Sequence, residues 1–301
     1  MSAKKLLLLF LVAAFLIALA MVGVAHYFLR PLKAEAVAQE ALKQAGLEVR
    51  EASYGLELIP KAPKALLAFY PGARVEPLAY APVLAPVAEA GYLVVLLKVP
   101  SGIALLGKER ALEAHRAHSG LPWVGGGHSL GGVAAAELAA SEGLPLILFA
   151  SYPEKDLSQE NLPVLALFGT EDGLLPPEKA REKARLLPKN ARVVFVEGLN
   201  HAGFGAYGPQ KGDRPARRPR EALWREIQEE VLLFLGGLGL DAPPPRLDCY
   251  TASHPKNLKA AKGWKEKLSR AAFFLRIPRP CNRETRNPRN PANTSAPLPL
   301  T

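Results

Sequence analysis

The chain is short of cysteine, and this shortage limits the chemistry open to most of its length. Both of its cysteines, Cys249 and Cys281, lie beyond residue 240. Residues 1–240 can therefore contain no disulfide, no thiolate nucleophile and no cysteine ligand for a metal. The cysteine-rich composition typical of an oxidising compartment is also absent, so other features have to indicate where the protein works.

Residues 1–240 also lack a strong net charge. The chain carries a formal charge of +10, but residues 241–301 hold 12 Lys and Arg against 4 Asp and Glu, a net of +8. The preceding part is left with +2, so we expect no nucleic-acid binding by the core domain. The apolar fraction of 49% favours a globular protein over a disordered one.

Residues 1–32 are predicted to be a membrane anchor or a signal. Lys4 and Lys5 precede a run of 23 residues, Leu6 to Phe28, in which His26 alone is polar. As a helix this run would be about 34 Å long, enough to cross a bilayer, whereas signal cores usually have about 7–15 residues. The length favours an uncleaved transmembrane helix with the following domain outside the cytoplasm. Small residues at 18–20 and 23–25 also permit cleavage, so secretion is the alternative.

Residues 33–240 are predicted to form one α/β domain. An early helix over 35–45 is followed by a hairpin over 49–60. Further strands are expected at 65–70, 92–99, 123–124, 146–150, 164–168 and 192–196, and helices at 77–90, 103–118, 130–141, 177–187 and 220–235. This alternation indicates a mostly parallel central sheet flanked by helices. Such a sheet binds ligands at the carboxyl ends of its strands.

The motif Gly-His-Ser-Leu-Gly at residues 127–131 lies between an expected strand and an expected helix. A serine nucleophile needs an exposed oxygen on a sharp turn, and glycines on both sides let the backbone turn sharply. The helix amino terminus also favours a developing negative charge. The motif predicts Ser129 as a nucleophile, although a glycine-rich turn that only packs helix against strand would look the same.

Two further residues supply the partners that a nucleophilic serine needs. Asp172 follows the strand expected at 164–168, and His201 follows the strand expected at 192–196. A serine needs a base, and the base needs an orienting acid. Taken singly, Asp172 would be a turn residue and His201 a loop histidine. Together with Ser129, at three carboxyl ends of strands, they predict a catalytic triad.

These segments resemble the α/β-hydrolase superfamily, in particular its compact, lidless bacterial members related to dienelactone hydrolase. The likeness runs from about Leu66 to Leu235 and rests on residues 70–73, 127–132, 169–172 and 200–205. It implies an α/β-hydrolase fold with Ser129 as nucleophile, His201 as base and Asp172 as its orienter. Dienelactone hydrolases use cysteine at the position of Ser129, so their substrate does not follow from the likeness.

Two backbone amides are expected to hold the oxyanion of the reaction. One is the N–H of Leu130, the residue after the nucleophile. The resemblance places Tyr-Pro-Gly-Ala, residues 70–73, where many relatives have His-Gly. It therefore implies Ala73 as the second donor and Gly72 as the next choice, with an ordinary Pro-Gly turn as the alternative.

The remaining polar candidates are weaker. Arg74 and Lys98 could hold an acidic substrate group, but solvated side chains are more typical. His115 and His118 have no companion ligands, so no metal site is predicted. We expect His128 to be structural.

The sequence therefore predicts a membrane-anchored serine hydrolase that acts on small-molecule acyl esters without cofactor or metal. An acyltransferase on the same triad and a non-catalytic binding protein are the alternatives. Residues 151–162 are too few for the lid usually inserted there, so we expect an open site, with 204–219 as the candidate cover.

Residues 241–301 are predicted to be a disordered basic tail. This segment holds four of the five threonines and five of the eight asparagines as well as both cysteines. Such a tail could bind anionic lipid or nucleic acid, or it could be an extension translated out of frame with no selected role. In either case we expect it to be dispensable.

Overall fold

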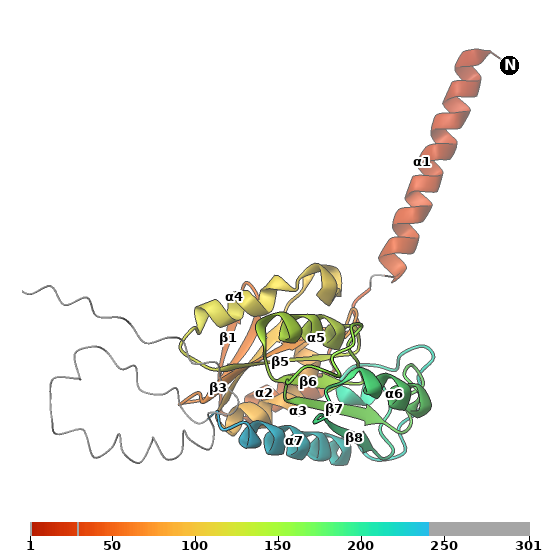
Figure 1. The fold of residues 1–301 in the computed structure, drawn as a ribbon. Coiled ribbons are helices and arrows are strands. Elements are labelled where there is room, and N and C mark those ends of the chain that lie inside the picture. Colours follow the sequence, from red (N-terminus) through yellow and green to blue (C-terminus); the bar gives the residue numbers. More distant parts are fainter. Residues whose placement is uncertain (1, 29, 241–301) are drawn as a thin grey trace, which may run out of the picture. The chain divides into compact units, whose positions relative to one another are not determined.

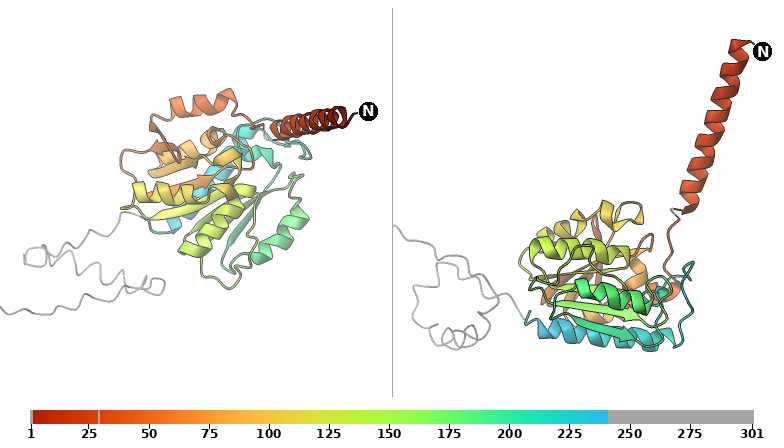
Figure 2. Two further views of the ribbon diagram at one scale, coloured as in Figure 1. Left: turned by 90° about the horizontal axis from the view of Figure 1, so that it is seen from above. Right: turned by 45° about the vertical axis from the view of Figure 1, so that its right-hand side comes forward.

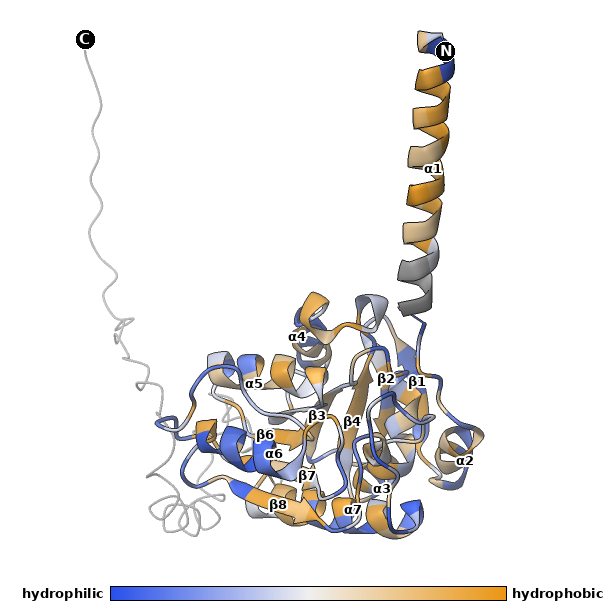
Figure 3. Ribbon diagram, turned by 90° about the vertical axis from the view of Figure 1, so that its right-hand side faces the viewer, coloured by the Kyte–Doolittle hydropathy of each residue, from blue (hydrophilic) through white to orange (hydrophobic). Residues whose placement is uncertain are grey.

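The computed structural model describes residues 2–28 and 30–240, so the predicted tail at 241–301 lies outside the described residues. The chain begins with a long apolar helix, α1 (Ala3–Phe28). Its stretch Ala3–Gly23 has a mean hydropathy of 3.0 and is long enough to cross a membrane. Figure 3 shows that apolar residues follow each other along this helix. Its length and composition are consistent with a signal sequence or a membrane anchor.

A mixed sheet of eight strands forms the centre of the domain, in the order β1-β2-β4-β3-β5-β6-β7-β8. The predicted hairpin is present as β1 (Glu48–Ala52) and β2 (Gly55–Ile59), and β2 also pairs antiparallel with β4. The strands from β4 to β8 in this order are mutually parallel. They are β3 (Ala65–Tyr70), β4 (Tyr92–Leu97), β5 (Trp123–His128), β6 (Leu146–Phe149), β7 (Val164–Gly169) and β8 (Arg192–Val196). The mostly parallel sheet is confirmed.

Helices cover both faces of this sheet (Figures 1 and 2). One face carries α2 (Ala36–Gln44), α3 (Ala81–Glu89) and α7 (Arg220–Gly237), and the other carries α4 (Glu109–Ala117), α5 (Leu130–Glu142) and α6 (Pro177–Lys183). Alternate strand residues point to opposite faces. In β3, Leu67 and Phe69 join one core while Leu66 and Ala68 join the other, and all are buried. A strand buried on both faces reads as a continuous apolar run, which is how the sequence presented it.

Two sequence predictions need correction. The helix expected at 103–118 is divided into a 3₁₀ turn, Ala104–Leu106, and α4. Gly107 lies between them with non-helical angles, and the carbonyl of Lys108 accepts the Tyr70 hydroxyl. The strand expected at 123–124 runs on to His128. Its three glycines have little strand propensity, but β3 and β6 pair with them on both sides.

Candidate active site

Ser129 lies in a strained turn between β5 and α5. Its backbone angles are φ 52° and ψ −122°, a region that residues with a side chain rarely adopt. Hydrogen bonds hold it there, from Ser129 N–H to the Phe149 carbonyl (2.9 Å) and from the Ser151 hydroxyl to the Ser129 carbonyl (2.7 Å). The next glycine, Gly131, is required because a Cβ there would lie 2.5 Å from the Tyr70 carbonyl oxygen. The sharp turn predicted from the motif is therefore present at the amino end of α5.

Asp172 and His201 meet at the carboxyl ends of β7 and β8. The Nδ1 atom of His201 lies 2.8 Å from Oδ2 of Asp172, and the two residues are 2% and 1% exposed. The other oxygen of Asp172 accepts the amides of Leu174 (2.8 Å) and Leu175 (2.7 Å). Both carboxylate oxygens are thus occupied, and the orientation of the carboxylate is fixed by its own loop.

The second ring nitrogen of His201 has no such partner. If Nδ1 donates its proton to Asp172, then Nε2 carries a lone pair and can accept a proton. Within the described part of the chain, Nε2 is buried and makes no hydrogen bond, to Ser129 or to any other residue. The ring of His128, next to Ser129 in the chain, lies 4.6 Å from the ring of His201. The histidine therefore lies beside the serine turn with an open nitrogen.

Asp213 connects the loop that contains Asp172 with the loop that contains His201. The sequence gave no indication of this role. Its Oδ1 accepts the amides of Gly173 (3.0 Å), His201 (3.2 Å) and Arg214 (2.9 Å). Its Oδ2 accepts the amide of Ala202 (2.8 Å) and the side-chain amide of Asn200 (2.9 Å). Charged acceptors make stronger hydrogen bonds than neutral ones. The Asp213 carboxylate, which lies in the segment 204–219, thus fixes backbone next to Asp172 and next to His201.

The loop after β3 is a tight turn over residues 72–75. The Val75 amide donates to the Gly72 carbonyl (3.0 Å), and Arg74 has a positive φ of 63°. The Arg74 amide donates to Gly102 (2.8 Å), and the Gly72 amide donates to the hydroxyl of Tyr80 (2.9 Å). The Ala73 amide makes none of these bonds. Gly72 is therefore engaged within the fold, whereas Ala73 is the amide of this turn best able to serve a ligand.

A buried pair links this turn to the serine turn. The Tyr80 hydroxyl lies 2.8 Å from Nδ1 of His128, and both side chains are almost fully buried. Burial, together with the neighbouring His201, holds the pKa of His128 well below its usual value, and burial raises the pKa of Tyr80. Both groups are therefore neutral at pH 7. Since Tyr80 accepts from Gly72, it is free to donate to His128, which makes His128 a structural residue.

The other candidates from the sequence lie elsewhere or have other partners. Lys98 lies 3.9 Å from Glu51 at the surface, and Arg74 interacts within its turn. The ring of His115 stacks on Trp123, with centroids 4.4 Å apart. The Nε2 atom of His118 lies 2.7 Å from the buried Glu57. Among the described residues, no three His, Cys, Asp or Glu side chains are arranged to hold a metal ion.

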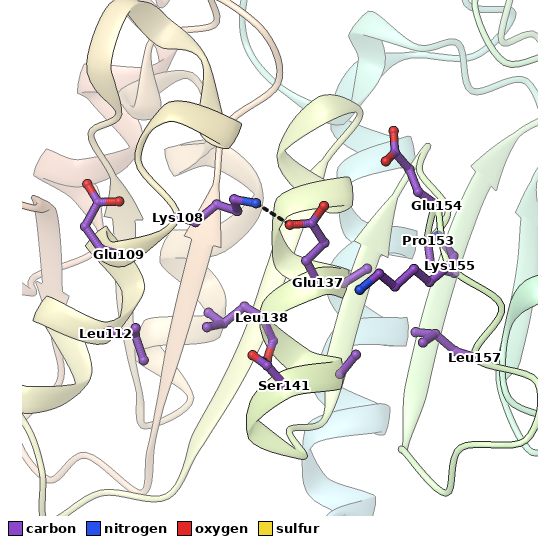
Figure 4. Close-up of a pocket in the computed structure, with 12 residues that line it drawn as sticks. Lys108, Glu109, Leu112, Glu137, Leu138, Ser141, Pro153, Glu154, Lys155 and Leu157 are labelled. Atoms are coloured by element: carbon purple, nitrogen blue, oxygen red, sulfur yellow. Dashed lines mark hydrogen bonds and ion pairs between the residues drawn. The ribbon is translucent and has the colours of Figure 1, made fainter.

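A surface groove lies away from these residues. It has a volume of about 670 Å³ and is lined by α4, α5 and the loop after β6, as Figure 4 shows. Lys108 and Glu137 form an ion pair across it. Neither Ser129 nor Asp172 nor His201 lines this groove.

Two buried residues beside the site gave no signal in the sequence. Tyr80 falls within an apolar segment that reads as a helix, and Tyr207 within a glycine-rich loop. The Tyr207 hydroxyl is buried without a hydrogen-bond partner in the described residues, and its ring lies 6.4 Å from that of His128. Their roles, like that of Asp213, depend on contacts between distant segments, which no local motif reveals.

Comparisons with known proteins give a family match and several solved structures of low sequence identity. The model of a family described as "Alpha/beta hydrolase family" matches residues 66–225. A search of curated proteins finds no match. Among solved structures, the esterase Est2 of Thermogutta terrifontis is 19% identical with a TM-score of 0.48, covering 67% of this chain and 95% of its own. A predicted CIB-like hydrolase of Thermoplasma acidophilum is 16% identical with a TM-score of 0.49, covering 63% and 100%. Est1E of Butyrivibrio proteoclasticus, solved with ferulic acid, is 14% identical with a TM-score of 0.46, covering 64% and 97%.

Proposed function

The chain belongs to the alpha/beta hydrolase family, and from this premise we propose that it is a serine hydrolase that cleaves acyl esters through Ser129, His201 and Asp172. One observation carries the proposal. A buried histidine is hydrogen-bonded to a buried aspartate through Nδ1, leaves Nε2 open, and lies beside a serine held in a strained turn. Among the described residues, His128 and His115 also have one buried nitrogen without a partner, so the open nitrogen supports the proposal only together with the bond to Asp172 and the strained serine turn.

The reaction follows from these positions. Ser129 turns its Oγ towards His201 and attacks the ester carbonyl carbon, while Nε2 takes the hydroxyl proton. Asp172 stabilises the imidazolium that forms. The tetrahedral intermediate breaks its bond to the alcohol oxygen, and the alcohol leaves with the proton from His201. Water then attacks the acyl-enzyme with His201 again as base, and the carboxylic acid is released.

The negative oxygen of the intermediate would be held by the amides of Leu130 and Ala73. Leu130 begins α5, where amides are not paired within the helix and the helix dipole favours negative charge. Ala73 is preferred to Gly72, because the Gly72 amide already donates to Tyr80. A donor of this kind typically contributes about 10²–10³ in kcat.

We further propose an open site for short or exposed acyl groups. The connection from β6 to β7 spans only residues 150–163, too short for a lid domain. The candidate cover, 204–219, is fastened at Asp213. We therefore expect no sharp increase in rate caused by a lid opening at lipid interfaces, and we infer a relation to the lidless members of the family.

The N-terminal helix is proposed to stay attached and to hold the domain outside the cytoplasm. The apolar run is longer than a signal core, and Lys4 and Lys5 precede it. Secretion after cleavage is the alternative. Recovery of the full-length, uncleaved protein in the soluble fraction would contradict the anchor.

The test is covalent labelling by a fluorophosphonate probe, combined with ester turnover. The wild-type protein should be labelled at Ser129, and Ser129→Ala should lose labelling and about 10³-fold or more in kcat. Ser141→Ala is the control, since Ser141 lies in α5 with its hydroxyl on the Leu138 carbonyl. Near-native turnover by Ser129→Ala would refute the mechanism. An unlabelled, inactive wild type would favour a binding protein, and ester products with an added alcohol would favour an acyltransferase.

A further inference from the structure

The segment that follows the N-terminal helix is built into the edge of the sheet that carries the proposed site. Leu32 forms a parallel bridge with Val75. Its amide donates to the Arg74 carbonyl (2.6 Å), and its carbonyl accepts the Glu76 amide (3.0 Å). These partners lie at the end of the 72–75 turn that contains Ala73. The segment after α1 is therefore first bound to the turn that contains Ala73, the proposed oxyanion donor.

The next residues contact the loop that follows His201. Ala34 forms an antiparallel bridge with Tyr207, and the Glu35 amide donates to the Ala206 carbonyl (2.9 Å). The Ala34 amide also donates to the Glu76 carboxylate (2.9 Å), and Glu35 forms an ion pair with Arg220 (2.7 Å). Leu32, Ala34 and Glu35 thus join the two loops that flank the site. A flexible linker would make no such contacts.

The tether between this segment and the helix is short. The helix α1 ends at Phe28, four residues before Leu32. Four residues span at most about 14 Å when fully extended. The headgroup layer on one side of a bilayer is about 5–8 Å thick. If α1 spans a membrane, the carboxyl edge of the sheet therefore has to stay close to the headgroups, whatever angle the helix adopts. The opposite edge lies about 20 Å away, the length of a six-residue strand such as β5.

Exposed basic residues at the carboxyl edge of the sheet also favour a position close to the membrane. Arg30 and Lys33 are exposed in the segment itself, and Lys211 and Arg214 are exposed in the loop on the histidine side. The acidic residue between the last two, Asp213, is occupied by five hydrogen bonds. Basic residues near an anionic membrane surface contribute about 1 kcal/mol each to binding. The edge that the tether holds near the membrane is thus suited to anionic headgroups.

We infer that the carboxyl edge of the sheet docks on the headgroup layer of the membrane that holds α1, and that the substrates are acyl esters presented at that layer. The inference rests on the proposed hydrolase function and on the helix remaining attached. An ester carbonyl at headgroup depth would meet Ser129 directly, whereas a dissolved ester would gain nothing from the tether. The open site proposed above agrees with this, because no lid would have to move for a lipid-borne ester to enter.

The docking can be measured without relying on activity. The full chain, with Cys249→Ser and Cys281→Ser, would be placed in phosphatidylcholine vesicles containing phosphatidylglycerol and a headgroup-linked nitroxide quencher. A fluorophore would be attached at Gly208→Cys or, as the matched control, at Gly120→Cys. Both glycines have open space at the Cβ position. Gly208 follows Tyr207 at the site, while Gly120 precedes β5 at the far edge. We expect quenching at least about threefold stronger at position 208, and equal quenching would overturn the inference.

Activity in the same vesicles tests the substrate class. A 20-residue Gly/Ser insertion between Arg30 and Pro31 adds about 25 Å of flexible reach and removes the constraint. Hydrolysis of a fluorogenic ester phospholipid in the vesicle should fall at least about fivefold, while hydrolysis of p-nitrophenyl acetate stays unchanged. An unchanged ratio of the two rates would refute membrane-presented substrates. Asymmetric quenching without hydrolysis of either ester would refute the hydrolase function and leave the docking supported.

Discussion

Among the described residues, two histidines pair with a buried carboxylate, and the pairs differ in position: His201 is buried beside the serine turn, whereas His118 is partly exposed at the end of α4. In one, His201 Nδ1 lies 2.8 Å from Asp172; in the other, His118 Nε2 lies 2.7 Å from Glu57. Glu57 is completely buried and also receives the Tyr54 hydroxyl (2.5 Å) and the Arg50 guanidinium (2.6 Å). Burial, followed by the hydrogen bond to Glu57, raises the pKa of Tyr54 to about 12.

The difference shows that a histidine–carboxylate pair does not by itself indicate catalysis. Glu57 lies within β2, where it serves as a closed junction between the hairpin and the end of α4. Asp172 lies after a parallel strand and leaves its histidine one unused nitrogen beside a serine. The two pairs are distinguished by position, because His201 lies at the carboxyl edge of the parallel strands beside a serine in a strained turn. Five predictions test or refine this contrast, in order of decreasing effect.

The largest effect is expected from Asp172→Asn. The amide keeps the shape of the side chain but favours the wrong histidine tautomer and no longer stabilises the imidazolium. We expect kcat to fall by about 10²–10⁴, less than for Ser129→Ala, with only a small change in KM. Steady-state kinetics on a soluble ester would measure this. Glu171→Gln is the matched control, because Glu171 pairs with the exposed Arg217 (3.1 Å). A larger loss for Glu171→Gln would mean that Glu171 is the acid.

Glu57→Gln should instead reduce stability and spare activity. Removing one partner of a buried ionic network typically costs about 3–5 kcal/mol, and we expect about 2–4 because Arg50 is half exposed. Denaturant unfolding would measure the change, with kcat altered less than twofold. Glu51→Gln on the neighbouring strand is the control, since its ion pair with Lys98 is exposed and should contribute under about 0.5 kcal/mol.

The same pair predicts a pH dependence of this stability difference. Burial alone would raise the pKa of Glu57, but hydrogen bonds from Tyr54, His118 and Arg50 outweigh it, so the pKa is lowered. A lowered folded-state pKa stabilises the protein above the unfolded-state pKa, and this contribution is lost as the pH falls through the folded value. Wild type and Glu57→Gln should therefore converge in unfolding free energy below about pH 4. If the two unfolding free energies converged at alkaline pH instead, the lowered pKa of Glu57 would be contradicted.

A smaller effect on turnover is expected from Asp213→Asn. The substituted amide cannot accept at both ends, so the bonds to either the Gly173 or the Ala202 side are lost. We expect kcat to fall by about tenfold, since His201 and Asp172 remain but are less well aligned. Asp156→Asn is the control, because Asp156 is an exposed aspartate that caps only Ser158. Equal effects of the two substitutions would show that Asp213 does not position the site.

The smallest effect is expected from truncation after Leu240. Neither histidine–carboxylate pair includes a residue beyond this point, and α7 already ends at Gly237. Activity and melting temperature should stay unchanged within error. Comparison of the truncated and full-length proteins by thermal unfolding would settle this, and a marked loss of stability would show that residues 241–301 pack on the domain.

Much of the fold could be predicted because buried parallel strands leave a strong local pattern. The apolar run at 65–70 coincides with β3, and the strand expected at 192–196 coincides with β8. The motif glycines also located the serine turn, since that turn has no room for side chains. The extent of β5 was missed because Gly125 and its neighbours carry no strand signal, and only pairing on both sides defines them.

The site was predictable to the degree that its residues follow strands. Asp172 and His201 fall at strand ends, where the topology brings them together. Asp213 lies in a loop without regular structure, and its importance comes from five donors in three separate segments. No spacing rule connects residues 173, 200 and 213. The bridges of Leu32 and Ala34 could not be predicted either, because they also join distant segments.

The glycine-rich strand before Ser129 also restricts how this protein can diverge. A methyl group at Gly126 would press on Phe69 and Leu67, and one at Gly131 would collide with backbone. Drift at Gly126, Gly127, Gly131 and Gly132 is therefore costly, whereas the exposed residues of the connections at 150–163 and 204–219 can change without opening the core. New acyl specificities would be expected to arise in those two loops, around a nucleophile that can hardly vary. A library designed to alter selectivity should leave the strand untouched and randomise only exposed loop residues, keeping Ser151 and Asp213, which hold the site.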